Sequence, residues 1–179
     1  MSGSQEIRSQ IASIQNTQKI TKAMEMVAAS KMKKAQDQMI KARPYADKIS
    51  NVISHLAHAH PEYTSEFFAT REVKKKGYII ISSDRGLCGG LNNNLFKLVV
   101  ETIEEDNKSD IKPAFSLIGS KATSFFQRMG GDVMAQTAQL GDKPQIEQVL
   151  GLIKSTIDSF ISGEIDEVYL VYNKFLNTV

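Results

Sequence analysis

The sequence predicts a long N-terminal helix followed by a parallel α/β domain. Three observations predict this fold class. Residues 7–56 contain no Gly and one Pro, and their apolar residues recur at a helical spacing. Residues 77–172 alternate short β-branched runs with amphipathic segments, which is typical of a sheet covered by helices. The chain has 179 residues, with no Trp and one Cys. Because one Cys cannot form a disulfide within the chain, the fold is not held by a disulfide framework.

The composition indicates an ordinary folded protein. Hydrophobic residues make up 41% of the chain and charged residues 23%, which excludes wholesale disorder. The first residues contain no apolar run, and no uncharged stretch approaches the ~18 apolar residues needed to cross a bilayer. We therefore expect a soluble protein of a reducing compartment, without a secretory signal.

The apolar residues of the first part predict a coiled-coil seam. Counting from Ile7 in alternating steps of four and three residues gives fifteen positions, of which twelve are apolar. Alternating steps of this kind follow the period of the seam of a left-handed coiled coil. Such a helix, about 75 Å long, needs a second helix to cover its seam. We therefore expect the isolated chain either to self-associate through residues 7–56, with the two helices antiparallel, or to leave the helix frayed and mobile. Pro44 is expected to bend or loosen the helix. The seam residues singled out are Ile7, Ile11, Ile14, Ala28, Met32, Ala35, Ile49, Ile53 and Leu56.

The same helix has a basic face. Residues 1–60 carry nine Lys or Arg and four Asp or Glu, whereas residues 61–179 carry thirteen and sixteen. A solvated helix face is the plainest interpretation, and contact with nucleic acid, an anionic membrane or an acidic protein are the alternatives. Nucleic-acid binding is disfavoured because Lys dominates and Tyr45 is the only aromatic residue before Tyr63. The basic residues are Lys19, Lys22, Lys31, Lys33, Lys34, Lys41 and Arg43.

The second part alternates strands and helices in the order βαβαβαβ. The strand candidates are short apolar runs, two of the helices end at Gly130 and Gly163, and Pro144 is expected to begin the last helix. Short connections between these elements imply a right-handed, Rossmann-like parallel sheet. The expected strands are 77–83, 113–118, 132–137 and 167–172, and the expected helices are 91–107, 120–129 and 144–161. The expected organisation is a long helix over 1–60, a connector over 61–76 and the α/β domain over 77–179.

The loop after the first strand, residues 84–92, is rich in Gly but lacks the spacing of a nucleotide site. Its glycines do not match G-x-G-x-x-G, and Gly119-Ser120-Lys121 lacks the earlier Gly of a phosphate loop. No set of Ser, His and Asp suggests a nucleophile with its base. We therefore predict no catalytic residue, no cofactor site and no metal site. The density of Gly beside Asp84 and Arg85 favours a compact contact loop.

Two smaller features leave alternatives open. His55, His58 and His60 lie near a helix end, where metal ligation is conceivable but solvated His is more common. Cys88 is either a reactive thiol beside Arg85 or a small half-buried thiol, which is the more frequent case.

Two segments closely resemble the gamma subunit family of bacterial F-type ATP synthases. The first is Ile11–Met32, IASIQNTQKITKAMEMVAASKM, and the second is Ser83–Asn92, SDRGLCGGLN. The resemblance continues through Tyr172–Phe175 and covers essentially the whole chain. The family's chains are longer, and their C-terminal helix, with its own signature, is absent here. We therefore expect an N-terminal portion, without the partner helix and with an incomplete α/β domain.

The resemblance implies a rotor subunit of the central stalk. In that family the N- and C-terminal helices form an antiparallel coiled coil inside the ring of alternating alpha and beta subunits. ATP chemistry takes place on beta and alpha, while gamma transmits torque and is not itself catalytic. The resemblance also implies contacts with the epsilon subunit and the membrane c-subunit ring. It therefore implies a peripheral position at the cytoplasmic face of the bacterial inner membrane.

The resemblance also places two groups of residues against acidic loops of the beta subunits. Complementary charge would then explain the excess of Lys in the helix. The first group is Met24, Lys31, Lys33 and Lys34, and the second is Arg85, Gly86, Leu87, Cys88, Gly89, Gly90 and Asn92.

Two other classes of function compete with this one. An enzyme with a small-molecule site at the sheet edge predicts saturable nucleotide binding. A Lys-rich nucleic-acid binder predicts binding that falls steeply with salt, whereas a rotor subunit predicts only weak, non-specific binding.

Overall fold

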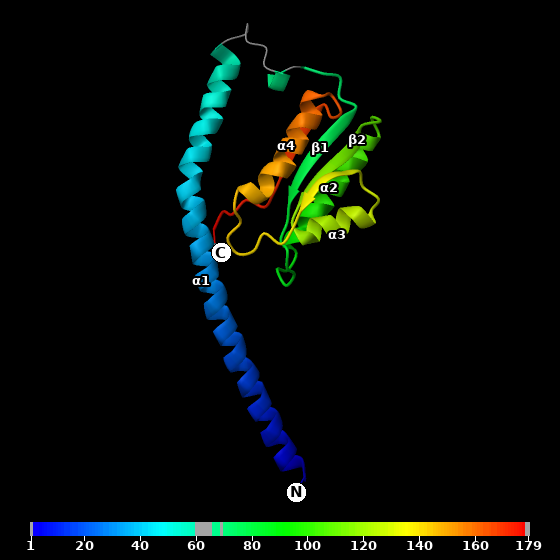
Figure 1. Ribbon diagram of the computed structural model, residues 1–179. Helices are drawn as coiled ribbons and strands as arrows, with labels where there is room; N and C mark the ends of the chain where they lie inside the picture. Colours follow the sequence, from blue (N-terminus) through cyan, green and yellow to red (C-terminus); the bar gives the residue numbers. More distant parts are fainter. Residues whose placement is uncertain (1, 60–65, 69, 178–179) are drawn as a thin grey trace. The chain divides into compact units, whose positions relative to one another are not determined.

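The computed structural model describes residues 2–59, 66–68 and 70–177. The chain divides into two compact units, Met1–Tyr63 and Thr64–Val179. Within the described residues, the first unit is one helix, and the second is a parallel sheet with helices on both faces (Figure 1). The predicted fold class, a long helix followed by a Rossmann-like parallel α/β sheet, is confirmed.

The first unit is the helix α1, Ser2–Ala59, which has 58 residues (blue to cyan in Figure 1). Strong helix formers such as Ala, Lys, Met and Gln fill most of its positions. It continues through Pro44, so the loosening expected there does not end the helix. Thr17 and Thr21 donate their hydroxyls to carbonyl oxygens one turn back, at 3.0 and 2.9 Å, which satisfies these polar groups within the helix.

The apolar residues of the predicted seam are solvent-exposed along α1. Ile14 is 68% exposed, Ile11 and Ile53 are each 50% exposed, and even Ile49 is 41% exposed. A single helix cannot cover its own apolar stripe, so these side chains need a second helix to become buried. The coiled-coil pairing itself remains a prediction.

Four parallel strands form the sheet of the second unit. Their order is β3-β2-β1-β4, so the chain moves outward from β1 on one side and then crosses to place β4 on the other. In sheets of this kind, ligands and partners meet the loops at the carboxyl ends of the strands, where the order reverses. The strands are β1 Lys75–Ile81, β2 Lys112–Ile118, β3 Val133–Thr137 and β4 Glu167–Val171.

The helices α2, Leu91–Asn107, and α3, Ser120–Arg128, cover one face of the sheet, and α4, Glu147–Ile161, covers the other (Figure 1). A short 3-10 helix, Glu66–Phe68, precedes β1. A cluster of buried apolar residues forms the core on the α2 and α3 side, and Asn92 is a buried polar residue of α2. The members of the cluster are Tyr78, Ile80, Leu95, Phe96, Val99, Ile103, Phe115, Leu117, Ala122 and Phe126.

The predicted start of α4 at Pro144 is wrong by three residues, because the helix begins at Glu147. The N–H of Gln145, the residue before the N-cap Ile146, donates to the side-chain oxygen of Gln148 at 2.8 Å and so ties the turn to the first turn of the helix. The residues from Pro144 therefore form the turn that leads into the helix. The other elements of this unit begin and end within two residues of their predicted bounds.

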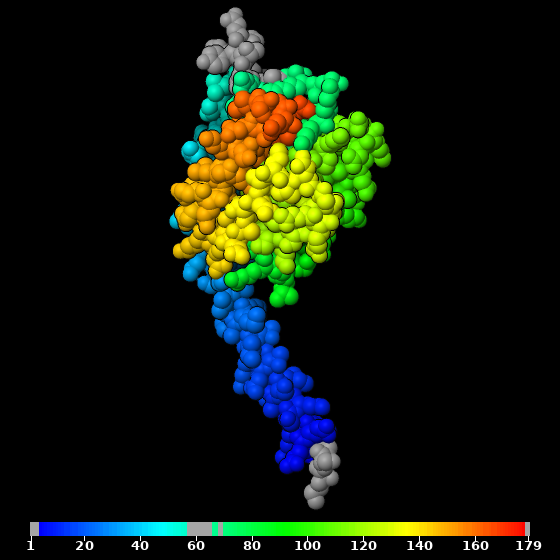
Figure 2. All heavy atoms as spheres, turned by 45° about the vertical axis from the view of Figure 1, so that its right-hand side comes forward, coloured from blue at the N-terminus to red at the C-terminus, as the bar shows by residue number. Residues whose placement is uncertain are grey.

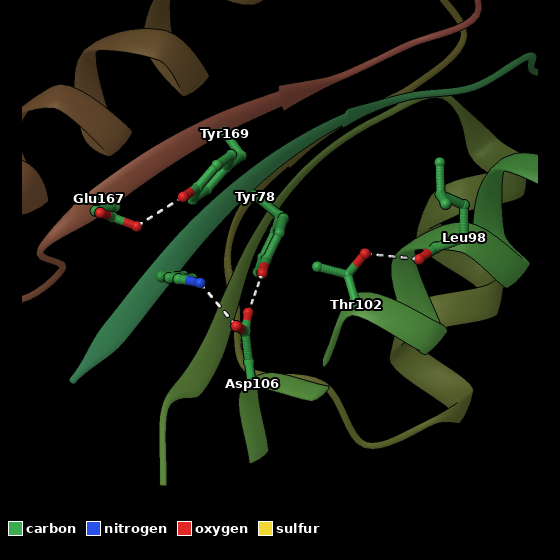
Figure 3. Close-up of polar contacts among 7 residues, drawn as sticks. Tyr78, Leu98, Thr102, Asp106, Glu167 and Tyr169 are labelled. Atoms are coloured by element: carbon green, nitrogen blue, oxygen red, sulfur yellow. Dashed lines mark hydrogen bonds and ion pairs between the residues drawn. The ribbon is translucent and has the colours of Figure 1, made fainter. Parts of the chain in front are cut away.

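An ion pair joins the end of α2 to the start of β1 (Figure 3). Asp106 accepts hydrogen bonds from Nζ of Lys76 at 2.7 Å and from the hydroxyl of Tyr78 at 2.6 Å. Burial acts to raise the pKa of Asp106, but these two hydrogen bonds outweigh it and hold the pKa below its ordinary value. Tyr78 also stacks on Tyr169 of β4, with ring centroids 5.6 Å apart. The network fixes α2 to the middle of the sheet.

Candidate functional site

The predicted contact loop lies at the carboxyl end of β1. The chain turns sharply there before α2 begins, and the segment projects at the lower edge of the α/β unit (Figures 1 and 2). Leu87 has a left-handed backbone, with φ of 62°, and its side chain is fully exposed. Gly89 has φ of 59°, a conformation that glycine adopts without strain. The left-handed conformation is strained for a Leu, and the loop holds it there.

Asp84 fixes the base of this loop. Its Oδ1 accepts the backbone N–H and the hydroxyl of Ser120, both at 2.9 Å, and the N–H of Gln139 at 2.9 Å. Its Oδ2 accepts the N–H of Leu140 at 3.0 Å. The hydrogen bond from the N–H of Gln139 is the largest cause that lowers the pKa of Asp84. Burial acts to raise this pKa, but the hydrogen bonds from Ser120 and Leu140 lower it further. One carboxylate therefore joins the loops that follow β1, β2 and β3.

Asn92 holds the other end of the loop. Its amide nitrogen donates to Oγ of Ser83 at 2.8 Å and to Sγ of Cys88 at 3.3 Å. Its amide oxygen accepts the N–H of Ser83 at 3.2 Å, and Oγ of Ser83 donates to the carbonyl oxygen of Arg85 at 2.6 Å. Cys88 is half-buried, as in the more frequent of the two alternatives, and its thiol is part of this local network.

A groove runs between the loop and α3. Its volume is about 830 Å³, which is within the range of binding clefts. Five of the predicted loop residues line it, whereas Arg85 and Gly90 do not, and its other lining residues, on α2 and α3, were not predicted as site residues. The lining residues are Gly86, Leu87, Cys88, Gly89, Asn92, Asn93, Phe96, Lys121, Ser124, Phe125, Gln127 and Arg128.

The second predicted group lies on α1, in the other unit. Met24 is 64% exposed, and the three Lys residues, Lys31, Lys33 and Lys34, are also on the exposed surface of the helix. Lys31 and Lys34 are one helical turn apart, whereas Lys33 lies on a different side, so the positive charge is spread around the helix. The contacts of both groups with other subunits remain predictions.

No group of three His, Cys, Asp or Glu that could hold a metal ion is found among the residues that the structure describes. The predicted alternative of a His cluster cannot be placed, because His60 and the side chain of His58 lie outside the described residues. None of the helices that the structure describes is long and apolar enough to cross a membrane.

The fold and the loop together define a protein built from one long helix and a Rossmann-like α/β unit with a projecting loop after β1. A family model described as ATP synthase matches residues 3–179, and the chain belongs to this ATP synthase family. Over all of its 179 residues the chain is 54% identical to the ATP synthase gamma chain of Nitrosococcus oceani and 54% identical to that of Pasteurella multocida. It is 51% identical over the same length to the ATP synthase gamma chain of Acinetobacter baylyi. The chain spans 62% of the length of each of these relatives.

Proposed function

We propose that this sequence belongs to the central rotor stalk of a proton-translocating F-type ATP synthase. The subunit couples proton flow through the membrane sector to conformational change in the alpha and beta subunits, where ATP is made or hydrolysed. It transmits torque and has no catalytic residue of its own. The match to gamma chains over the whole sequence supports this proposal, and the single observation that carries it is the unbroken 58-residue helix α1.

The helix has the properties that a rotating shaft requires. Seven of its nine basic residues are Lys, and Lys forms pairs that are less directional and more easily exchanged than the bidentate pairs of Arg. Such charges attract acidic loops of three beta subunits in turn without binding any of them tightly. Met24 and the Lys residues at 31, 33 and 34 make these contacts, together with the loop from Arg85 to Asn92.

The remaining partners follow from the same assignment. The subunit binds the epsilon subunit and the c-subunit ring, and it is peripheral to the cytoplasmic face of the bacterial inner membrane. Neither nucleic acid nor a cofactor has a part in this function.

The experiment introduces a positive charge at Met24 in the gamma subunit of the complete synthase. Met24→Lys adds an ion pair with an acidic beta loop, and a partly desolvated pair of this kind is worth about 1–3 kcal/mol in one rotary position. The complex should assemble normally, and proton pumping per ATP hydrolysed should fall. Met24→Leu, which conserves volume without adding charge, is the control and should couple normally. Unchanged coupling in the Met24→Lys complex would refute the proposal.

A further inference from the structure

The helix α4 has a stripe of exposed apolar residues along one side. Its members are Ile146, Leu150, Ile157 and Ile161, with exposed fractions of 65%, 49%, 36% and 41%. At 3.6 residues per turn they lie within about 60° of one another around the helix. Within the part of the α/β unit that the structure describes, α2 and α3 lie on the other face of the sheet, so neither can cover this stripe (Figure 1). A contiguous apolar surface on a helix is typical of a contact between proteins.

The stripe is separate from the side of α4 that packs on the sheet. On that side Leu152 is 5% exposed and Thr156 is fully buried. The hydroxyl of Thr156 lies 2.6 Å from the hydroxyl of Ser116 on β2, with a hydrogen bond between them. The helix therefore has two sides that exclude polar residues, and the sheet uses only one of them.

The spacing of the stripe is the same in both directions along the chain. Ile146 and Leu150 are four residues apart, Ile157 and Ile161 are also four residues apart, and seven residues separate Leu150 from Ile157. A second copy of α4 that runs antiparallel can therefore place its Ile161 against Ile146 and its Ile157 against Leu150. The twofold axis of this pair would pass between residues 153 and 154, and helices packed in this way cross at about 20°.

Charges beyond the two ends of α4 suit the same register. Lys143 lies before the helix and Glu164 lies after it, and both are exposed. These two residues are equally far from the twofold axis, so Lys143 of each copy lies towards Glu164 of the other. Oε2 of Glu164 accepts the hydroxyl of Ser159 at 2.8 Å, which holds the carboxylate beside the end of the helix.

We propose that this stripe is a docking surface for a second copy of the chain, whose α4 binds in the antiparallel register. The inference goes beyond the proposed function, because it concerns the chain outside the synthase and a surface that the rotor proposal does not use. It needs neither alpha nor beta subunits for its test, so its failure is distinct from failure of the rotor proposal. It is also independent of self-association through α1, which belongs to the other unit.

The test is disulfide cross-linking of the full chain at micromolar concentration under mild oxidation. The background variant Cys88→Ser removes the one native thiol. In Leu150→Cys/Ile157→Cys the two thiols of one copy are about 10.5 Å apart along the helix, which is too far for a bridge within that copy. Antiparallel pairing brings each of them against the other position of the second copy, so this variant should form a disulfide-linked dimer.

The single variants identify the register. Neither Leu150→Cys nor Ile157→Cys alone should form the dimer, because identical positions are also about 10.5 Å apart across the twofold axis. A mixture of the two single variants should form it. Lys143→Glu, added to the double variant, should slow cross-linking about threefold, and Lys143→Glu/Glu164→Lys should restore the rate.

The control variant is Gly151→Cys/Asp158→Cys, which has the same spacing on another side of α4. It should form about tenfold less dimer in the same time. The substitution Ile49→Gln/Ile53→Gln in α1 should leave the yield of the Leu150→Cys/Ile157→Cys dimer unchanged. Circular dichroism checks that each variant is folded.

Three results would overturn the proposal. If Leu150→Cys/Ile157→Cys stays monomeric, then α4 is not paired with a second copy, and some other segment covers the stripe or none does. If the control variant forms as much dimer, the cross-link reports only random collision. If Leu150→Cys alone forms the dimer, the helices do not pair in the antiparallel register.

Discussion

The backbone N–H of Gln139 donates to Oδ1 of Asp84 at 2.9 Å, although 55 residues separate them in the chain. This bond joins the loop after β1 to the loop after β3 across the intervening strand β2. The same carboxylate also accepts from Ser120 and Leu140, so the exposed contact loop begins at a firmly held residue. A loop that is fixed at its base can present Leu87 to a partner with little loss of entropy on binding.

Removal of the Asp84 carboxylate should destabilise the α/β unit. Asp84→Ala leaves the N–H groups of Ser120, Gln139 and Leu140 without their acceptor, and we expect a loss of about 2–3 kcal/mol in the free energy of unfolding. Asp158→Ala, an exposed carboxylate on α4, should change it by less than about 0.5 kcal/mol. Urea unfolding of the two variants measures both values. Equal stability of the two variants would contradict the role assigned to Asp84.

The unfolding free energy should fall at acid pH. Asp166 accepts the backbone N–H groups of Lys74 and Lys75 at 2.8 and 2.9 Å, and these bonds lower its pKa. The pKa values of Asp84 and Asp106 are also lowered in the folded protein, so the contribution of the three carboxylates to stability is fully present above the unfolded pKa of about 3.9. This contribution to the unfolding free energy is lost as the pH falls through the lower pKa values of the folded state. The carboxylates of the folded protein then take up protons, which weakens the hydrogen bonds that they accept. We expect little change between about pH 7 and 5 and a fall below about pH 4. Asp84→Asn should make the fall shallower, and an unchanged slope would count against the assignment.

Two glycines should respond in opposite ways to the same substitution. At Gly119, where φ is 99°, an added Cβ would lie 2.3 Å from the carbonyl oxygen of Ser82, so Gly119→Ala should cost at least about 3 kcal/mol. At Gly151, in the interior of α4, an added Cβ meets nothing within 4 Å, and Gly151→Ala should stabilise the protein by about 0.5–1 kcal/mol. Chemical denaturation of the α/β unit within the full chain measures both. The same sign for the two substitutions would show that the backbone at Gly119 is not as described.

The isolated chain should self-associate through α1. The seam residues Ile49 and Ile53 are 41% and 50% exposed, respectively. A second copy of the helix can bury them. Sedimentation equilibrium should show a mass that rises with protein concentration. Ile49→Gln/Ile53→Gln should weaken the association, whereas Lys48→Gln/Asn51→Gln, away from the seam, should not. A strictly monomeric and fully helical chain at micromolar concentration would contradict this prediction.

Local patterns are enough to predict the elements of the fold. β-branched runs such as Ile79–Ile81 mark buried strands, and Gly130 and Gly163 mark the residues just after helix ends. The start of α4 is harder to predict, because a Pro at position 144 does not reveal the bond from the backbone N–H of Gln145 to the side chain of Gln148.

The candidate site is only partly predictable from the sequence. The loop from Arg85 to Asn92 is one continuous segment, and its Gly density alone indicates a contact loop. Lys121 and Arg128 give no such local signal, because they become part of the groove only through the parallel pairing of β1 with β2. The carboxylate of Asp84 likewise finds Ser120 and Gln139 only after two crossover connections have formed. Such contacts depend on the topology of the sheet, so the spacing of residues along the sequence does not predict them.

Co-assembly of this chain with alpha and beta subunits of an ATP synthase is the decisive test of the rotor proposal. The three are mixed or co-expressed, and the complexes are separated by size-exclusion chromatography coupled to light scattering. A full-length gamma chain serves as the positive control for a competent alpha and beta preparation. We expect the chain to elute as part of the alpha and beta assembly and to be displaced by an excess of the full-length control. A chain that elutes entirely apart from subunits that do assemble with the control would contradict the proposal.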